Sequence, residues 1–350
     1  MSGDILLDVQ DLRTSFFTDD GEVKSVDGVS FQVRKGETVA LVGESGCGKS
    51  VTSYSIMGLV SKPGRIVDGS INFEGKDLTK IPNHSLQKIR GNEISMIFQE
   101  PLTSLNPLFS VGFQISEVLI VHKKLSKKQA KERSIELLKE VGIPRADKVF
   151  DNYPHDLSGG MRQRVMIAMA LACNPKLLIA DEPTTALDVT IQKQILYLMR
   201  KLSRSHDTSI IVITHDLGVV AELADRVVVM YAGKVVEEND VYSLFENPKH
   251  PYTKGLLNST PDINNLNETL ISIEGTVPDH TEMPIGCRFH PRCEFAHDRC
   301  RQSAPPLLTT EDGTKVRCWL YEEEGEPNDS AQSTGSTGAG AGSKKLKEVL

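Results

Sequence analysis

A glycine-rich octapeptide near the N-terminus has the residue types and spacing of a phosphate-binding loop. It reads Gly43-Glu44-Ser45-Gly46-Cys47-Gly48-Lys49-Ser50 and follows an apolar, strand-like run. Glycines let backbone N–H groups surround a polyphosphate, the lysine offers a positive charge to the β and γ oxygens, and the serine hydroxyl can bind Mg²⁺. A chance glycine turn is the alternative, which the preceding run disfavours. The residues expected to contact nucleotide are Gly43, Ser45, Gly46, Gly48, Lys49 and Ser50.

A second segment, far along the chain, can also hold a phosphate. The run Leu157-Ser158-Gly159-Gly160-Met161-Arg162-Gln163 is a glycine turn that leads into a helix, where backbone N–H groups point at an anion. One nucleotide is not expected to fill both sites of one chain. The pair therefore predicts ATP held between two subunits.

Polar residues follow three further strand-like runs. Asp181 ends an apolar run and is expected to reach Mg²⁺ directly or through water, while Glu182 is placed to orient and deprotonate an attacking water. Gln99 and His215 each follow another such run. Each residue alone could be an ordinary turn or helix-cap residue. Because the ends of parallel strands meet at one crevice, the set predicts a single site.

The pattern of apolar runs around these residues predicts an α/β fold. Strands and helices alternate through the middle of the chain, which favours a parallel sheet covered by helices. Strands are expected at 5–9, 23–33, 38–42, 70–73, 94–98, 177–180, 210–214 and 227–231, and helices after Lys49, across 111–141 and at 190–203. The charged, amphipathic stretch 127–139 indicates the solvent face of an inserted helical subdomain. Asp19-Asp20-Gly21 and Arg34-Lys35-Gly36 have the composition of hairpin turns.

The composition limits the classes of function. The chain has 350 residues, enough for one large domain and a smaller one. Its 40 basic and 47 acidic residues give a net charge of −7, so no general polyanion-binding surface is expected. No apolar run approaches the roughly 18 residues of a membrane span, and the N-terminus lacks the features of a secretory signal. We therefore expect a cytoplasmic protein that leaves any membrane function to a partner.

Four of the six cysteines crowd one C-terminal region. They are Cys287, Cys293, Cys300 and Cys318. In a reducing compartment this clustering favours a metal over disulfides, and four thiolates can order a loop-rich region by binding it. The spacings are looser than those of zinc ribbons and suit an iron–sulfur cubane. Zinc, with His290 or His297 replacing a thiolate, and free buried thiols remain alternatives, whereas Cys47 and Cys173 are expected to be small buried apolar residues.

The order of these motifs resembles an ABC-type ATPase cassette over about residues 5–245. The resemblance implies an ABC-type P-loop NTPase with a RecA-like parallel-sheet core, an antiparallel β subdomain and an inserted α-helical subdomain, followed by a small Cys-rich C-terminal region. It implies that Glu182 is the catalytic base, His215 the switch that contacts the γ-phosphate, and Gln99 the Q-loop residue and a candidate Mg²⁺ ligand. No catalytic position departs from the pattern, so an active ATPase is expected rather than a non-catalytic scaffold.

The same resemblance implies roles for the nucleotide-binding residues. It matches Lys49 and Ser50 to Walker A, Asp181 to Walker B, Asp188 to the D-loop in Ala186-Leu187-Asp188, and Ser158 and Gly160 to the signature. Phe16 fits the aromatic residue that stacks on adenine. Phe17 competes for this role because an insertion at 18–21 blurs the alignment.

Three segments narrow the resemblance to the ATP-binding subunits of oligopeptide, dipeptide and nickel permeases. They are 153–165, 181–190 and His250-Pro251-Tyr252-Thr253. The C-terminal cysteines are similar to those of the D-type subunit, whose members carry an iron–sulfur cluster. The implied cofactors are ATP, Mg²⁺ and a [4Fe-4S] cluster, with zinc as the alternative metal.

Composition and resemblance together divide the chain. We expect a cassette at 1–246 with a helical subdomain at about 100–165, a C-terminal extension at 247–322, and a disordered tail at 323–350. Within the extension, 262–268 has the composition of a loop.

The implied function is ATP hydrolysis that energises a membrane importer of oligopeptides or dipeptides. The implied partners are a second, homologous but distinct ATPase subunit, two transmembrane permease subunits and an extracytoplasmic substrate-binding protein, with no nucleic acid. The subunit would lie peripherally on the cytoplasmic face of the membrane, and its surface around 99–109 would grip a coupling helix. A nickel or other small-solute importer is one alternative. A soluble ABC ATPase acting on ribosomes or DNA is the rival class, disfavoured by the single cassette and the C-terminal position of the cysteines.

Overall fold

A central eight-stranded sheet organises the computed structural model, which describes residues 4–99, 104–185, 187–259 and 273–322. Its strand order is β11-β12-β10-β9-β3-β8-β7-β6, and the strands from β9 to β6 run parallel. The strands are β3 (Thr38–Val42), β6 (Ile94–Ile97), β7 (Leu177–Asp181), β8 (Ser209–Thr214), β9 (Arg226–Tyr231), β10 (Lys234–Asp240), β11 (Leu308–Thr309) and β12 (Lys315–Val316). The expected parallel-sheet core is therefore present.

A second, antiparallel sheet of four strands has the order β2-β1-β4-β5. Its strands are β1 (Ile5–Thr18), β2 (Gly21–Arg34), β4 (Gly64–Phe73) and β5 (Lys76–Asp77). Thr18 pairs with Gly21, so the expected hairpin turn at 19–21 is confirmed. The hairpin expected at 34–36 is wrong. β2 and β3, on either side of it, belong to different sheets, because the buried side chains of β3 face helices on one side and the antiparallel sheet on the other.

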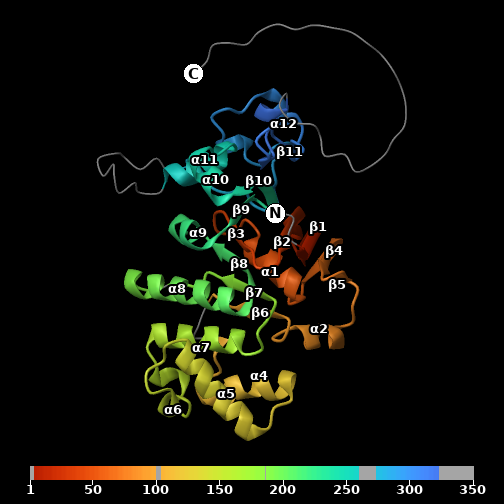
Figure 1. Ribbon diagram of the computed structural model, residues 1–350. Helices are drawn as coiled ribbons and strands as arrows, with labels where there is room; N and C mark the ends of the chain where they lie inside the picture. Colours follow the sequence, from red (N-terminus) through yellow and green to blue (C-terminus); the bar gives the residue numbers. More distant parts are fainter. Residues whose placement is uncertain (1–3, 100–103, 186, 260–272, 323–350) are drawn as a thin grey trace.

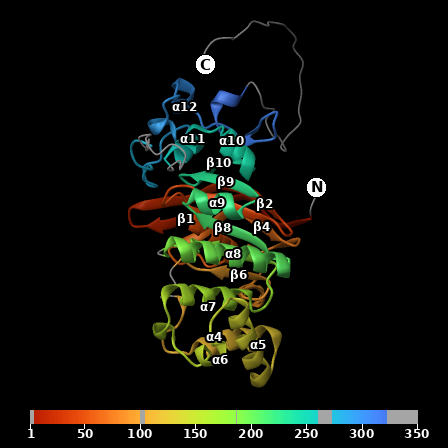
Figure 2. The ribbon, with the colours of Figure 1, turned by 60° about the vertical axis from the view of Figure 1, so that its left-hand side comes forward.

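Two apolar cores fill the opposite faces of the central sheet. Side chains alternate along a strand, so Val39 and Leu41 face one core while Ala40 and Val42 face the other. The first core joins the sheet to α1 (Lys49–Met57) and the antiparallel strands. The second packs against α8 (Val189–His206) and α9 (Leu217–Leu223), which cross one face of the parallel strands in Figure 2.

A helical subdomain occupies one end of the molecule, at the bottom of Figure 1. It contains α4 (Val111–Lys123), α5 (Lys127–Glu140), α6 (Ala146–Val149) and α7 (Gly159–Leu171), and α2 (Asn83–Ile89) lies on the way to it. Ser126 and Gln129 form a capping box that starts α5 at the expected place. The single helical stretch expected at 111–141 is two helices, because Lys124 ends α4 in a left-handed conformation.

The C-terminal region lies at the other end of Figure 1. It follows α10 (Val241–Glu246) and comprises α11 (Pro251–Asn258), α12 (Asp298–Gln302) and the short strands β11 and β12. β12 pairs with β10, so this region extends the central sheet rather than standing apart from it. The expectations of a loop at 262–268 and a disordered tail at 323–350 lie outside the described residues. Within the described segments, no helix is both long and apolar enough to traverse a bilayer.

Candidate functional site

The phosphate loop lies where β3 ends and α1 begins, as the sequence predicted. Gly43 has a φ of +150°, and a Cβ there would lie 2.2 Å from the carbonyl oxygen of Met230. Only glycine therefore fits this close approach of two backbones. The Nζ of buried Lys49 donates to the carbonyl oxygens of Gly43 at 2.7 Å and Glu44 at 2.9 Å. The lysine is thus held against the loop that would surround a polyphosphate.

Ser50 and Asp181 form a candidate Mg²⁺ site beside the loop. The Ser50 hydroxyl donates to Oδ1 of Asp181 at 3.2 Å. Asp181 is fully buried, and its Oδ2 has no hydrogen-bond partner in the described parts of the chain. Burial raises the pKa of this carboxyl group. A buried carboxylate oxygen without a partner, next to a serine hydroxyl, fits the oxygen ligands that Mg²⁺ prefers.

The carboxylate of Glu182 contacts the other predicted catalytic residues, Gln99 and His215. Its Oε2 accepts from the Gln99 amide at 2.9 Å and from the Thr185 hydroxyl at 2.8 Å, and its Oε1 lies 3.1 Å from Nδ1 of His215. Burial raises the pKa of Glu182, but the hydrogen bonds from Thr185 and His215 outweigh it and hold the pKa below its usual value. The carboxylate is therefore ionised near neutral pH, as a general base must be.

The backbone of Glu182 is unusual. Its φ is +46°, a left-handed conformation that is rare outside glycine, and its N–H donates to the carbonyl oxygen of Ile213 at 2.9 Å. Strain of this kind concentrates at functional sites. Here it turns the side chain out of the sheet directly after β7.

The predicted signature residues lie elsewhere. Ser158 is exposed and caps α7, accepting from the N–H of Met161 at 3.4 Å, and a Cβ on Gly160 would meet Ile191 of α8 at 2.9 Å. Asp188 caps α8 in the same area, accepting from Thr190 at 3.1 Å. Figure 1 shows α7 well away from α1. The structure thus brings together the phosphate loop, Asp181, Glu182, Gln99 and His215, and leaves the signature open at the surface.

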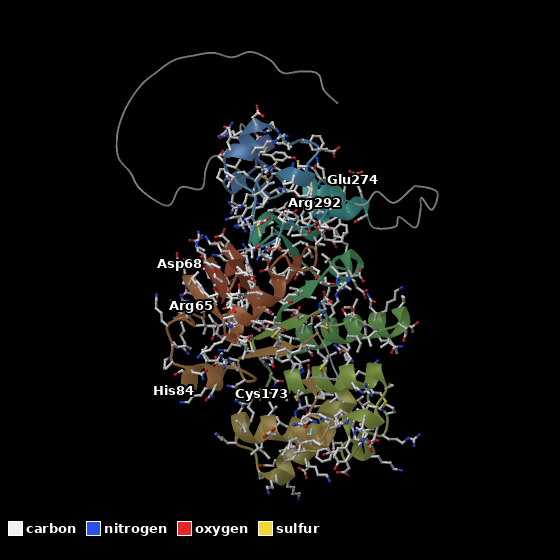
Figure 3. All side chains as sticks on the ribbon, turned by 180° about the vertical axis from the view of Figure 1, so that it is seen from behind. Arg65, Asp68, His84, Cys173, Glu274 and Arg292 are labelled. Atoms are coloured by element: carbon white, nitrogen blue, oxygen red, sulfur yellow. The ribbon has the colours of Figure 1, made fainter. Side chains whose placement is uncertain are left out.

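The two candidate adenine-stacking residues lie near the end of β1. Phe16 is half-buried, and its ring packs against Gly64. A Cβ added to Gly64 would lie 2.5 Å from the nearest ring carbon. Phe17 is 39% exposed, with the guanidinium of Arg65, labelled in Figure 3, 4.3 Å from its ring centroid. The role of Phe16 in stacking stays a prediction.

The four C-terminal cysteines line one small cavity. The rest of its wall includes the aromatic rings of Phe289 and Trp319 and two histidines, His250 and His290, the second of which is the alternative zinc ligand named above. Burial raises the pKa of the Cys293 thiol to about 11 and that of Cys318 to about 12, and neighbouring cysteines add to the increase. None of the six cysteines, each in a described segment, forms a disulfide, and Cys47 and Cys173 are buried as expected. Across the described segments, no three His, Cys, Asp or Glu side chains are arranged as ligands of one metal ion.

The C-terminal region also contacts the phosphate loop, which the sequence reasoning missed. Arg292 pairs with Glu44 through two contacts, of 2.7 and 3.0 Å. The hydroxyl of Tyr252 accepts from the Glu44 N–H at 2.8 Å, and His280 lies 2.7 Å from the carbonyl oxygen of Gly46. Tyr252 and Arg292 lie in segments that the sequence singled out, but for other reasons, and His280 lies in neither. No local pattern marks Arg292 or His280, because their partners are more than 200 residues away.

Comparisons with known proteins agree with this arrangement. The model of the ABC transporter family matches residues 26–185, and that of the oligopeptide/dipeptide transporter C-terminal region matches 236–300. The chain is 60% identical to the oligopeptide transport ATP-binding protein AppD of Bacillus subtilis (91% of this chain, 98% of that protein) and 51% identical to OppD of Escherichia coli (92% and 95%). It is 48% identical to the dipeptide transport ATP-binding protein DppD of E. coli (92% and 99%).

Solved structures are similar over the cassette. A dimeric structure of the ATP-binding cassette MJ0796 with ADP and Pi is 27% identical, with a TM-score of 0.61. The match covers 67% of this chain and 98% of that one. About a third of this chain has no counterpart in that cassette structure, so this chain is the longer of the two.

Proposed function

The chain belongs to the ABC transporter family of ATP-binding proteins, and on this premise we propose that it hydrolyses ATP to drive the uptake of oligopeptides or dipeptides. One observation supports this most strongly. Identity of 48–60% to oligopeptide and dipeptide transport ATP-binding proteins extends over nearly the whole length of both chains. The assembled phosphate loop and the Glu182 cluster supply the chemistry of an ATPase.

In the proposed mechanism the phosphate loop binds ATP and Glu182 activates water. Lys49 would leave the loop carbonyls and contact the β and γ oxygens, as its position against the loop allows. Ser50 and Asp181 would hold Mg²⁺, which neutralises phosphate charge when bound, and Gln99 is a further candidate ligand. Glu182 would accept the proton of water, and His215 would contact the γ-phosphate while orienting that carboxylate.

We propose that two cassettes complete each site. Ser158 and Gly160 would contact the γ-phosphate of ATP bound by the opposite subunit, since they lie at an exposed helix N-terminus away from their own phosphate loop. Asp188 would lie at the same interface, and Phe16 would stack on adenine. The similar MJ0796 cassette is described as dimeric. The partner here would be a homologous but distinct subunit.

The proposed membrane partners are two permease subunits, which would work with an extracytoplasmic substrate-binding protein. An exposed apolar surface in the described part of 99–109 and at the start of α4 supports docking of a coupling helix; residues 100–103 lie outside the described residues. Leu108 is 80% exposed, and the half-exposed rings of Phe109 and Phe113 stack with centroids 4.8 Å apart. Large exposed apolar side chains side by side are typical of interaction surfaces. The chain would therefore lie at the cytoplasmic face of the membrane.

Co-purification and transport test this proposal. Solubilised membranes should yield the tagged chain with two multi-span proteins and a second ATPase, and peptide uptake should fail when Glu182 is replaced. Ribosomes or DNA in place of membrane proteins would instead support the rival soluble ATPase. Uptake of labelled nickel without peptide uptake would support the nickel importer.

We also propose that the four C-terminal cysteines hold a [4Fe-4S] cluster. The cavity that all four thiols line supports it, because four cysteine thiolates gathered in one place are the donor set of such clusters. The cluster would give structural order to the region and needs no redox role. Broad visible absorption with iron and sulfide in anaerobically purified protein is expected. Zinc content or free thiols alone would contradict it.

The proposed division of the chain follows the sequence expectation. Residues 1–246 would form the cassette, 247–322 the extension and 323–350 a tail. The pairing of β10 with β12 means that the first two parts share one sheet, so the extension is expected to fold with the cassette rather than alone.

A further inference from the structure

The phosphate loop is held from outside the cassette at three of its polar groups. Two belong to Glu44, whose carboxylate meets Arg292 and whose N–H donates to the Tyr252 hydroxyl. The third is the carbonyl oxygen of Gly46, 2.7 Å from Nε2 of His280. All three holding residues lie in the C-terminal region, beyond the cassette proposed at 1–246.

Arg292 makes the strongest of these contacts. Its side chain is only 4% exposed, and it meets both carboxylate oxygens of Glu44 in a parallel, two-pronged pair. Such pairs are stronger than neutral hydrogen bonds and fix geometry as well as distance. The hydrogen bond with Glu44 is the main reason that the pKa of Arg292 is raised.

The remaining donors of Arg292 are held by its own region and by β9. They contact the carbonyl oxygens of Glu274 at 2.8 Å and Ile273 at 3.2 Å, and the Tyr231 hydroxyl at 3.4 Å. Figure 3 shows Arg292 beside Glu274 in this part of the molecule. With these contacts all five N–H donors of the guanidinium are used. A side chain so constrained can position the group it meets.

Glu44, the phosphate-loop residue that Arg292 contacts, lies close to the proposed nucleotide-binding groups. Glu44 follows Gly43 directly, and its carbonyl oxygen accepts from Lys49, the lysine expected to bind the β and γ phosphates. Any movement of Glu44 therefore moves a carbonyl oxygen that positions the Lys49 ammonium group. The carboxylate of Glu44 is also a negative charge near the place where the phosphates would bind, and Arg292 neutralises it.

The cysteine region determines where Arg292 lies. Arg292 ends the short turn His290–Arg292, between Cys287 and Cys293. In the same segment Phe289 packs on Tyr231 and Tyr252, with ring centroids 5.1 and 5.4 Å apart. A continuous set of packed groups thus joins the cysteine cavity to the phosphate loop.

We propose that Arg292 is a positioning residue for ATP binding, through which the C-terminal region sets the nucleotide affinity of the phosphate loop. This inference rests on the proposed ATPase site, and it adds a residue outside the recognised nucleotide motifs. Removing Arg292 leaves the Glu44 carboxylate without its partner beside the phosphates. The loss should then depend on that carboxylate.

A double-mutant cycle on the full-length chain tests the proposal. The dissociation constant of a fluorescent ATP analogue is measured without Mg²⁺, so that hydrolysis does not interfere. Arg292→Gln should weaken binding about tenfold, within the range of typical coupling between sites. In the Glu44→Gln background the same change should cost less than about threefold, because no carboxylate is left unpaired. The matched control is Arg301→Gln, an exposed arginine of the same region, which should bind as the unmodified chain does.

The outcomes separate the possible explanations. Wild-type affinity in Arg292→Gln, or equal losses with and without the Glu44 carboxylate, would overturn the proposal and leave Arg292 a purely structural residue. If Arg292→Gln does not fold, Glu44→Asp tests the same pair from the loop side, since the shorter carboxylate cannot meet both prongs. That variant should also bind several-fold more weakly, and unchanged binding would overturn the proposal. Failure of the unmodified chain to bind the analogue would instead refute the ATPase site itself.

Discussion

Replacing Glu182 by glutamine tests the proposed chemistry most directly. The substitution preserves the size of the side chain and removes the one carboxylate that meets Gln99, Thr185 and His215 together. A glutamine amide keeps one oxygen acceptor and replaces the other with an N–H donor. It cannot accept a proton from water.

The size of the effect follows from the role of the base. Loss of a positioned general base slows a reaction by about 10²–10⁴-fold, which corresponds to about 2.7–5.4 kcal/mol in the barrier. ATP binding should be unaffected, because Lys49 and Ser50 are unchanged and a negative charge near the γ-phosphate is removed. The variant is therefore expected to bind ATP and fail to hydrolyse it.

Two assays on the assembled complex separate these effects. Single-turnover hydrolysis of labelled ATP gives the chemical step, and equilibrium titration gives the affinity. The matched control is Glu222→Gln on the exposed face of α9, which should hydrolyse ATP at the normal rate. Hydrolysis by Glu182→Gln within about twofold of the unmodified rate would refute Glu182 as the base, and loss of binding would show that it serves the nucleotide pocket instead.

Three further predictions follow from the structure. Lys49→Ala should weaken ATP affinity roughly 10–100-fold, because a charge-assisted contact is lost; unchanged affinity in an equilibrium titration would contradict its role. Ser158→Asn retains an N-cap residue, so the melting temperature and the affinity of the isolated chain should hold while hydrolysis by the assembled complex falls at least tenfold; full activity would exclude the shared site. Burial raises the pKa of Asp27, but Lys234 and Arg288 outweigh burial and hold this pKa below its usual value. The ionised Asp27 carboxylate therefore stabilises the folded protein fully above about pH 4, and this stabilisation is lost as the pH falls through the lowered pKa. Asp27→Asn should cost roughly 3 kcal/mol in urea unfolding at pH 7, with a smaller difference near pH 3, and a pH-independent difference would contradict this assignment.

The catalytic group could be predicted from the sequence because its determinants are local. The phosphate loop is contiguous and bounded by a strand and a helix, whose periodicity is visible along the chain. Asp181, Glu182, Gln99 and His215 each end or follow a strand of one parallel sheet, and such ends must meet at one edge. Their hydrogen-bonded contacts in the structure agree with that expectation.

The conformation of single residues was not predictable in the same way. The left-handed backbone of Glu182 goes with a hydrogen bond from its N–H to Ile213 of β8, a contact that depends on how β7 and β8 lie side by side. The hairpin expected at 34–36 failed because a turn-like composition does not say whether the next strand continues the same sheet or enters another.

By itself, the sequence determined the nucleotide chemistry of this protein, because glycine spacing, strand ends and helix caps are properties of neighbouring residues. Only the tertiary structure decided that the C-terminal region extends the central sheet and holds the phosphate loop. Arg292 and Glu44 are 248 residues apart, and nothing in either local pattern indicates the other. Their pairing exists because β12 joins β10 and the aromatic rings of Tyr231, Tyr252 and Phe289 pack together, which places the turn before Cys293 against the loop.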